Sequence, residues 1–109
     1  MSETRVLAGA LIEKLRQQGK TIATAESCSG GLLAAALTDI PGASEVFGFG
    51  LITYSNAAKQ RLLGVAAATL ARYGAVSPET AQAMAAGLLR PSGADLAIGV
   101  AGIAGPGGG

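Results

Sequence analysis

Three side chains could carry acid–base or nucleophilic chemistry: Ser27, Tyr54 and Lys59. Each of them follows an apolar run in the sequence, either directly or within a few residues. A serine hydroxyl becomes an effective nucleophile only when a neighbouring group accepts its proton. The sequence has no histidine, which excludes a Ser-His-Asp triad, a histidine metal site and a histidine proton shuttle. A lysine whose pKa is lowered by burial or by a nearby cation is the remaining candidate base. Lys59 is the only lysine beyond the first 20 residues, so it is the candidate partner of Ser27.

Each of these residues also has a structural alternative. Long cationic side chains are usually exposed, so spacing alone favours a solvated helical lysine at position 59. Tyrosines are more often found at the edge of a core than as catalytic phenols, which is the alternative for Tyr54. Both interpretations stay open on the residues alone.

The stretch around Ser27 reads TAESCSGG over residues 24–31 and lies between a β-branched run and an alanine-rich run. It predicts a turn that leads from a strand into a helix, with glycines that permit a tight bend. Its polar groups either cap the helix or leave free N–H groups that bind an anion beside the serine. Glu26 either ties down the turn or orients the lysine, and the structural role is favoured. Cys28 is expected to be a small buried hydrophobe.

The elements that must position these residues alternate between helix and strand. Hydrophobic periodicity predicts helices over 3–18, 30–38, 56–63, 66–73 and 78–90, with Pro91 ending the last, and strands near 21–24, 46–54 and 95–101. This alternation indicates one layered α/β domain over residues 1–109. Ligands of such sheets gather at strand ends, where Ser27, Tyr54 and the glycine-rich stretch 102–109 would meet.

Composition excludes several classes of function. The net charge of +1 is scattered along 109 residues, so there is no basic stripe for nucleic acid. No run approaches the roughly 18 uncharged apolar residues of a membrane span, and the N-terminus lacks the pattern of a signal peptide. A single cysteine excludes an internal disulfide and a multi-cysteine zinc site. We therefore expect a cytoplasmic protein with no metal, no nucleic-acid partner and no membrane partner.

With these residues in view, the sequence resembles the CinA C-terminal domain, the nicotinamide-nucleotide amidohydrolase family. The matching segments follow the family's order and spacing, and they are TAESCSGG (24–31), TYSNAAK (53–59), LGV (63–65), GAVS (74–77), GAD (93–95) and GIAGP (102–106). The resemblance implies a three-layer α/β/α sandwich with a mixed sheet. It also implies hydrolysis of the carboxamide of nicotinamide mononucleotide, giving nicotinic acid mononucleotide and ammonia without a cofactor.

The resemblance assigns roles to individual residues. Ser27 becomes the nucleophile, Lys59 its general base, and Tyr54 a residue that assists proton transfer or holds the lysine. Backbone N–H groups near Ser29, Gly30 and Gly31 would stabilise an oxyanion or hold the substrate. The further residues expected at the nucleotide substrate are Glu26, Asn56, Gly102, Ile103, Ala104 and Gly105.

Two departures accompany the resemblance. Position 101 is Ala, where the family usually has a Thr or Ser hydroxyl. The family's domain also continues beyond this point through further strands and a last helix, so the sandwich is expected to be truncated at its C-terminal end. Exposed strand edges associate readily, which predicts a homo-oligomer. The alternative function is an inactive remnant that binds nucleotide or forms an oligomer surface.

Overall fold

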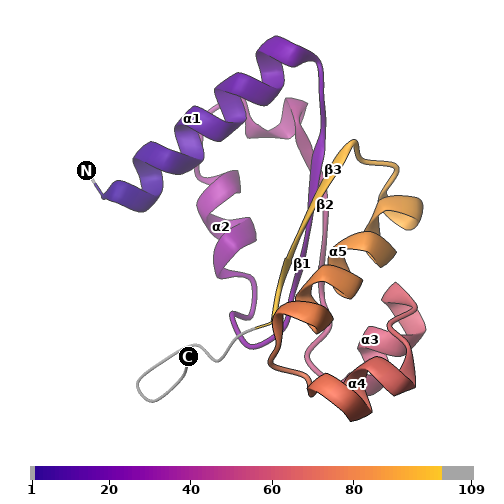
Figure 1. The fold of residues 1–109 in the computed structure, drawn as a ribbon. Helices are drawn as coiled ribbons and strands as arrows, with labels where there is room; N and C mark the ends of the chain where they lie inside the picture. The colour runs from indigo at the N-terminus through magenta and orange to yellow at the C-terminus, as the bar shows by residue number, and fades with distance from the viewer. Residues whose placement is uncertain (1, 102–109) are drawn as a thin grey trace.

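The computed structural model describes residues 2–101 of the chain as helices packed on a small sheet (Figure 1). In chain order the elements are α1 (Glu3–Gln18), β1 (Ile22–Glu26), α2 (Leu32–Thr38), the 3₁₀ turn η1 (Ala43–Glu45), β2 (Phe47–Ile52), α3 (Asn56–Leu63), α4 (Ala67–Tyr73), α5 (Pro78–Ser92) and β3 (Leu96–Val100). Figure 1 shows α1 and α2 on one face of the sheet and α3, α4 and α5 on the other. The predicted α/β/α layering is confirmed.

The described strands form a parallel sheet in the order β2-β1-β3. We expected a mixed sheet, and within residues 2–101 every strand pair is parallel instead. The reason is that each connection between strands contains helices, which return the chain to the same end of the sheet. At the carboxyl end of the central strand, Glu26 is the register partner of Ile52 on one side and Val100 on the other.

Serine caps begin the helices where the sequence predicts them. The hydroxyls of Ser2, Ser55 and Ser77 each accept a hydrogen bond from a backbone N–H three residues later, at 3.0–3.1 Å. The prediction that Pro91 ends α5 was wrong, because the helix runs on to Ser92. A proline in the last turn removes only one helical hydrogen bond, and α5 ends instead at Gly93, whose φ is 66°.

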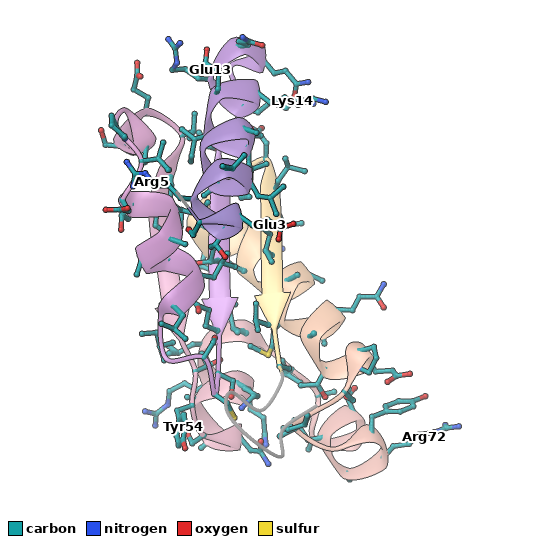
Figure 2. The ribbon with its side chains drawn as sticks, turned by 90° about the vertical axis from the view of Figure 1, so that its left-hand side faces the viewer. Glu3, Arg5, Glu13, Lys14, Tyr54 and Arg72 are labelled. Atoms are coloured by element: carbon teal, nitrogen blue, oxygen red, sulfur yellow. The ribbon has the colours of Figure 1, made fainter. Side chains whose placement is uncertain are left out.

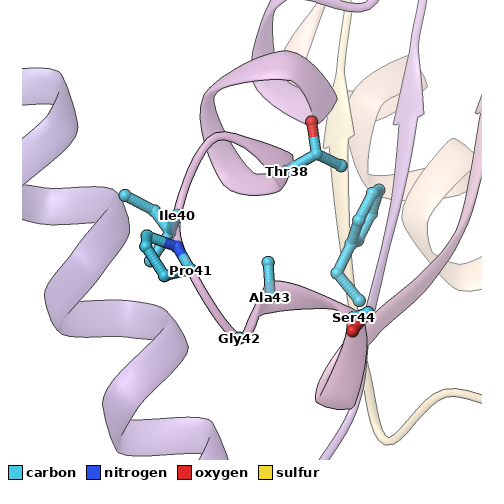
Figure 3. Close-up of a pocket in the computed structure, with 7 residues that line it drawn as sticks. Thr38, Ile40, Pro41, Gly42, Ala43 and Ser44 are labelled. Atoms are coloured by element: carbon cyan, nitrogen blue, oxygen red, sulfur yellow. The ribbon is translucent and has the colours of Figure 1, made fainter.

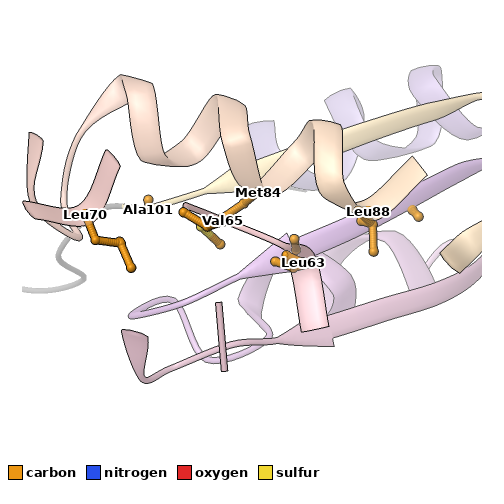
Figure 4. Close-up of a cluster of buried hydrophobic side chains, with 8 residues drawn as sticks. Leu63, Val65, Leu70, Met84, Leu88 and Ala101 are labelled. Atoms are coloured by element: carbon orange, nitrogen blue, oxygen red, sulfur yellow. The ribbon is translucent and has the colours of Figure 1, made fainter. Parts of the chain in front are cut away.

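A separate hydrophobic cluster fills each side of the sheet. The cluster on the α5 side, shown in Figure 4, comprises Ala23, Ala25, Leu63, Val65, Leu70, Met84, Leu88 and Ala101. The cluster on the α1 and α2 side comprises Ala8, Ile12, Leu15, Ile22, Leu37, Ala43 and Val46. All residues of β1 are buried between them, so the point at which β1 ends is firmly fixed in space.

Helix α5 contacts α3 and β3 at two glycines, Gly87 of α5 itself and Gly99 of β3. A Cβ atom at Gly87 would overlap the carbonyl oxygen of Leu63, and one at Gly99 would overlap that of Ala81. The absence of a side chain at these two glycines therefore lets the end of α3 and strand β3 lie against α5. Among the described helices, none is long and apolar enough to cross a membrane.

Candidate active site

The polar residues singled out in the sequence meet at one edge of the sheet. Because the strands are parallel, the residues that follow β1, β2 and β3 lie side by side, and we call this region the carboxyl edge. Ser27 follows β1, Thr53 and Tyr54 follow β2, and Ala101 follows β3. The N–H of Thr53 donates to the carbonyl of Glu26 at 2.8 Å, which extends the pairing of β1 with β2 up to Ser27. Figure 2 shows Tyr54 at this end of the strands.

Ser27 lies at the start of the turn and is 3% exposed. In β1, Ala23 and Ala25 direct their side chains into the cluster on the α5 side. Strand alternation predicts the same face for Ser27, and this is the face on which α3 lies. The serine therefore follows the most rigidly held strand of the sheet.

Lys59 belongs to the first turns of α3 and is 1% exposed. Its Nζ donates to the carbonyl oxygen of Tyr54 at 3.2 Å, and within residues 2–101 no carboxylate forms an ion pair with it. Burial lowers the pKa of Lys59, and an electrostatic interaction with the neighbouring Cys28 is a smaller effect in the opposite direction. The solvated alternative for this lysine is wrong, since the residue is 1% exposed and its burial shifts the amine toward the neutral, proton-accepting form.

Tyr54 contacts the lysine through its backbone carbonyl. Its side chain is 72% exposed, so it is not the core-edge aromatic of the structural alternative. Its carbonyl oxygen holds the amine of Lys59. Of the two roles expected for Tyr54, the geometry supports holding the lysine, while assistance in proton transfer stays a prediction.

The turn after β1 is held by Glu26. Its carboxylate accepts hydrogen bonds from the Ser29 hydroxyl at 2.8 Å and from the N–H groups of Leu33 and Ala34 at 2.9 and 3.0 Å. The N–H of Gly30 donates to the carbonyl of Ser27 at 3.0 Å. These N–H groups are therefore engaged within the protein, which favours the capping interpretation of the turn over anion binding at the start of α2.

The remaining predicted residues are placed as follows. Gly31 has a φ of 106° and precedes α2, and Asn56 is the exposed first residue of α3. Cys28, expected to be buried, is only partly so, because it lies in the turn and not in the strand. The predicted contacts at Gly102, Ile103, Ala104 and Gly105 lie outside the described residues.

Sequence reasoning missed Thr53. Its side chain is fully buried at the carboxyl edge, and its hydroxyl has no hydrogen-bond partner in the part of the chain that the structure describes. A buried hydroxyl without a partner costs stability and is therefore uncommon. In the sequence, the feature that could have pointed to Thr53 is its position as a polar residue directly after the apolar run of β2.

A hollow of about 450 Å³ opens at the carboxyl edge beside β3 and the start of α5. It is lined by Val76, Ser77, Pro78, Ala81, Gly99, Val100 and Ala101. Another cavity, of about 350 Å³, lies at the opposite end of the sheet between the end of α2 and the start of β2 (Figure 3). Phe47, the first residue of β2, lines this second cavity. The cavity is therefore separated from Ser27 by the length of a strand. Over residues 2–101, no group of His, Cys, Asp and Glu side chains could hold a metal ion.

Comparison with known proteins identifies the family of this chain. The sequence model described as the CinA C-terminal domain matches residues 4–109. The chain belongs to the CinA C-terminal domain family. A "CinA-like protein" of Desulfovibrio desulfuricans is 59% identical over 103 residues, which are 94% of this chain and 24% of the relative.

Other family members share both sequence and structure. The "Nicotinamide-nucleotide amidohydrolase PncC" of Enterobacter agglomerans is 51% identical over 111 aligned positions, covering 100% of this chain and 68% of that protein. The crystal structure of the competence/damage inducible protein CihA from Agrobacterium tumefaciens superposes with a TM-score of 0.92 at 49% identity. That superposition covers 100% of this chain and 66% of the solved one. The chain thus spans about a quarter of the CinA-like relative and about two thirds of PncC and CihA.

Proposed function

We propose that the carboxyl edge is a Ser-Lys amidohydrolase site that acts on the carboxamide of a nicotinamide nucleotide. The observation that carries the proposal is the burial of Lys59 at the sheet edge where Ser27 begins the turn after β1. The family relative named as a nicotinamide-nucleotide amidohydrolase supports the choice of substrate. The proposed reaction converts nicotinamide mononucleotide and water into nicotinic acid mononucleotide and ammonia.

The chemistry follows from a neutral lysine amine. Lys59 accepts the proton of the Ser27 hydroxyl while Oγ attacks the carboxamide carbon. The C–N bond then breaks, and the leaving nitrogen takes the proton from Lys59 and departs as ammonia. Water attacks the resulting ester, again giving a proton to Lys59, and the proton returns to Ser27 Oγ as the acid is released. Protons and bonds balance over the cycle, and no cofactor enters it.

Supporting roles fall to the turn and to the neighbouring strand ends. The Tyr54 carbonyl orients the amine of Lys59. Since the Gly30 N–H is engaged within the turn, we assign stabilisation of the oxyanion to the N–H groups of Ser29 and Gly31. Substrate contacts by Asn56 and by residues 102–105 belong to the same proposal, as do a single amidohydrolase domain over 1–109 and association of the chain with copies of itself.

The test is ammonia release from nicotinamide mononucleotide by the purified chain and by Ser27→Ala. Loss of the nucleophile should lower kcat by roughly 10³-fold or more, while the far-ultraviolet circular dichroism spectrum stays unchanged. Ser44→Ala, an exposed serine of η1 at the other end of the sheet, is the matched control and should retain wild-type activity. Folded wild-type protein that releases no ammonia, or an active Ser27→Ala variant, would refute the proposal.

One observation favours the alternative of nucleotide binding without turnover. Ala101 is buried at the carboxyl edge and brings no hydroxyl to the position where the family usually has one. A binding module would be stabilised by the nucleotide, by about 2.7 kcal/mol at a ligand concentration 100 times Kd. A rise in Tm with nicotinamide mononucleotide in the absence of ammonia release would select this alternative over the enzyme.

A further inference from the structure

Glu26 occupies the junction between the central strand and the turn that carries Ser27. It is 1% exposed, and both of its carboxylate oxygens accept hydrogen bonds. One donor is the Ser29 hydroxyl within the turn, and the others are N–H groups at the start of α2. We propose that Glu26 is a positioning residue whose carboxylate fixes the turn over 27–31 and thereby the Ser27 hydroxyl relative to Lys59. This inference rests on the proposed function, because it assigns Glu26 a part in the Ser27 chemistry.

The first support is that Glu26 joins two parts of the fold that are each held in place. Its backbone belongs to β1, which is paired on both sides, with Ile52 and Val100 as its register partners. Its side chain binds the N–H groups of Leu33 and Ala34 in the first turn of α2. The intervening residues 27–31 must therefore span a fixed gap, and their conformation is restricted as long as the carboxylate holds.

The second support is that Glu26 also holds the turn at its middle. Oε1 accepts from the Ser29 hydroxyl at 2.8 Å as well as from Leu33 N–H. Next to it, the Gly30 N–H closes a turn on the carbonyl of Ser27 itself. Ser27 thus lies between the residue that supplies the carboxylate and the residues that this carboxylate binds.

The third support is that α2 has no cap of its own. Its N-cap residue is Gly31, which has no side chain to offer, and the helix has only seven residues. Such a short helix depends on external hydrogen bonds for its position, and Glu26 supplies them from the strand. Loss of the carboxylate should therefore release the start of α2 together with the turn that precedes it.

The same contacts distinguish positioning from direct substrate binding, the role that the family resemblance suggested for Glu26. Glu26 is 1% exposed and its carboxylate accepts three hydrogen bonds within the protein, so a ligand has little access to it. Its influence on the reaction must pass through the turn. The consequence is that variants of Glu26 should change kcat and leave the KM for substrate nearly constant.

The experiment compares Glu26→Gln and Ser29→Ala with wild type in kcat, KM, Tm and the rate at which a serine-reactive fluorophosphonate labels Ser27. Glutamine preserves the shape but turns an NH₂ group toward backbone donors. A displacement of about 1 Å lowers rates by roughly 10²-fold, so we expect Glu26→Gln to lower kcat and the labelling rate by a similar factor, about 30- to 100-fold. Ser29→Ala removes one of the bonds and should cost about 3- to 10-fold, and Ser29→Thr should recover most of that loss.

The matched control is Glu3→Gln, an exposed carboxylate in the first turn of α1, which should leave all four measurements unchanged. A lower Tm with wild-type kcat and labelling would show that Glu26 is only a structural cap, and a raised KM with constant kcat would show direct substrate contact. Either result overturns the inference. If Glu26→Gln fails to fold, the comparison of Ser29→Ala with Ser29→Thr decides. Wild-type protein that is labelled at Ser27 but makes no ammonia would refute the proposed substrate alone, because labelling still measures the effect of Glu26.

Discussion

The two ends of the parallel sheet treat polar groups in opposite ways. At the amino end, the N–H and hydroxyl of Thr21 donate to the Asp95 carboxylate at 2.8 and 3.3 Å, and Asp95 N–H donates to the Thr21 hydroxyl at 3.3 Å. At the carboxyl edge, Lys59 is buried with a single carbonyl as its partner, and the Thr53 hydroxyl has none among the described residues. The exposed groups at the amino end pair with one another. At the carboxyl edge the Glu26 carboxylate is well bonded, but the buried Lys59 amine and Thr53 hydroxyl are poorly paired among the described residues.

This contrast separates residues that stabilise the fold from residues available for chemistry. Burying a polar group without full hydrogen bonding costs about 1–3 kcal/mol, so a protein does so at few places. Under-satisfied groups that persist tend to lie at functional sites, where a substrate completes their bonding. The carboxyl edge is also where open α/β sheets bind their ligands. The comparison therefore predicts that substitutions at the carboxyl edge change activity and those at the amino end change stability.

The largest expected effect is that of Lys59→Met on activity. Removal of a general base lowers rates by about 10²- to 10⁴-fold, and methionine preserves the length of the buried side chain. Ammonia release from nicotinamide mononucleotide measures the effect. Lys14→Met, on the exposed face of α1 and far from Tyr54 in Figure 2, is the control and should keep wild-type activity. A Lys59→Met enzyme with near wild-type kcat would contradict the prediction that the carboxyl edge of the sheet, unlike its amino end, serves the reaction.

A smaller effect of the opposite sign is expected for Lys59→Met on stability. Because burial lowers the pKa of Lys59 below its ordinary value of 10.5, the unfolded chain binds this proton more tightly than the folded one. The lysine therefore destabilises the fold at low pH, and this penalty fades as pH rises toward 10.5. Lys59→Met should raise the free energy of unfolding by roughly 1–3 kcal/mol at pH 7, with a smaller gain at pH 10.

Thermal denaturation of wild type and Lys59→Met at a series of pH values measures this difference. Taking the difference at each pH cancels the titration of the other groups. A gain that grows with pH would mean that the folded state binds the proton more tightly than the unfolded state. That outcome would contradict the buried, neutral amine on which the contrast depends.

The smallest effect belongs to the amino end. Asp95→Ala removes the acceptor of two Thr21 hydrogen bonds at an exposed site, so it should lower the free energy of unfolding by about 1 kcal/mol. Since Asp95 lies a strand's length from Ser27, kcat and KM should stay unchanged. Urea denaturation and ammonia release measure the two quantities. A loss of activity in a stable Asp95→Ala protein would show that the amino end also serves the reaction.

Most of the fold followed from local patterns in the sequence. The bounds of α3 were predicted to the residue, because Ser55 and Gly64 mark its ends by their own chemistry. The strands and the layering followed from the alternation of apolar runs with helices. The predicted end of α5 at Pro91 was wrong because a proline is tolerated in the last turn of a helix. The parallel pairing follows from the helices that lie between successive strands, and the expected mixed sheet came from the family resemblance and not from this alternation.

The candidate site was predictable in its residue types but not in its environment. The absence of histidine pointed to Lys59, yet only the folded structure shows that this lysine is buried. The bonds from Glu26 to Leu33 and Ala34 join residues on two elements, so the sequence left its role open. Thr53 was missed because its unpaired hydroxyl is a property of the assembled edge.

The pH dependence of Ser27 phosphonylation tests most directly whether Lys59 takes the serine proton. The measurement is the rate of fluorophosphonate labelling of Ser27, followed by mass spectrometry between pH 6 and 10.5 in wild type and in Lys59→Met. We expect a wild-type rate that rises with pH through the lowered pKa of Lys59, and a slow, flatter profile in the variant. The same rising profile and comparable rates in both proteins would contradict it.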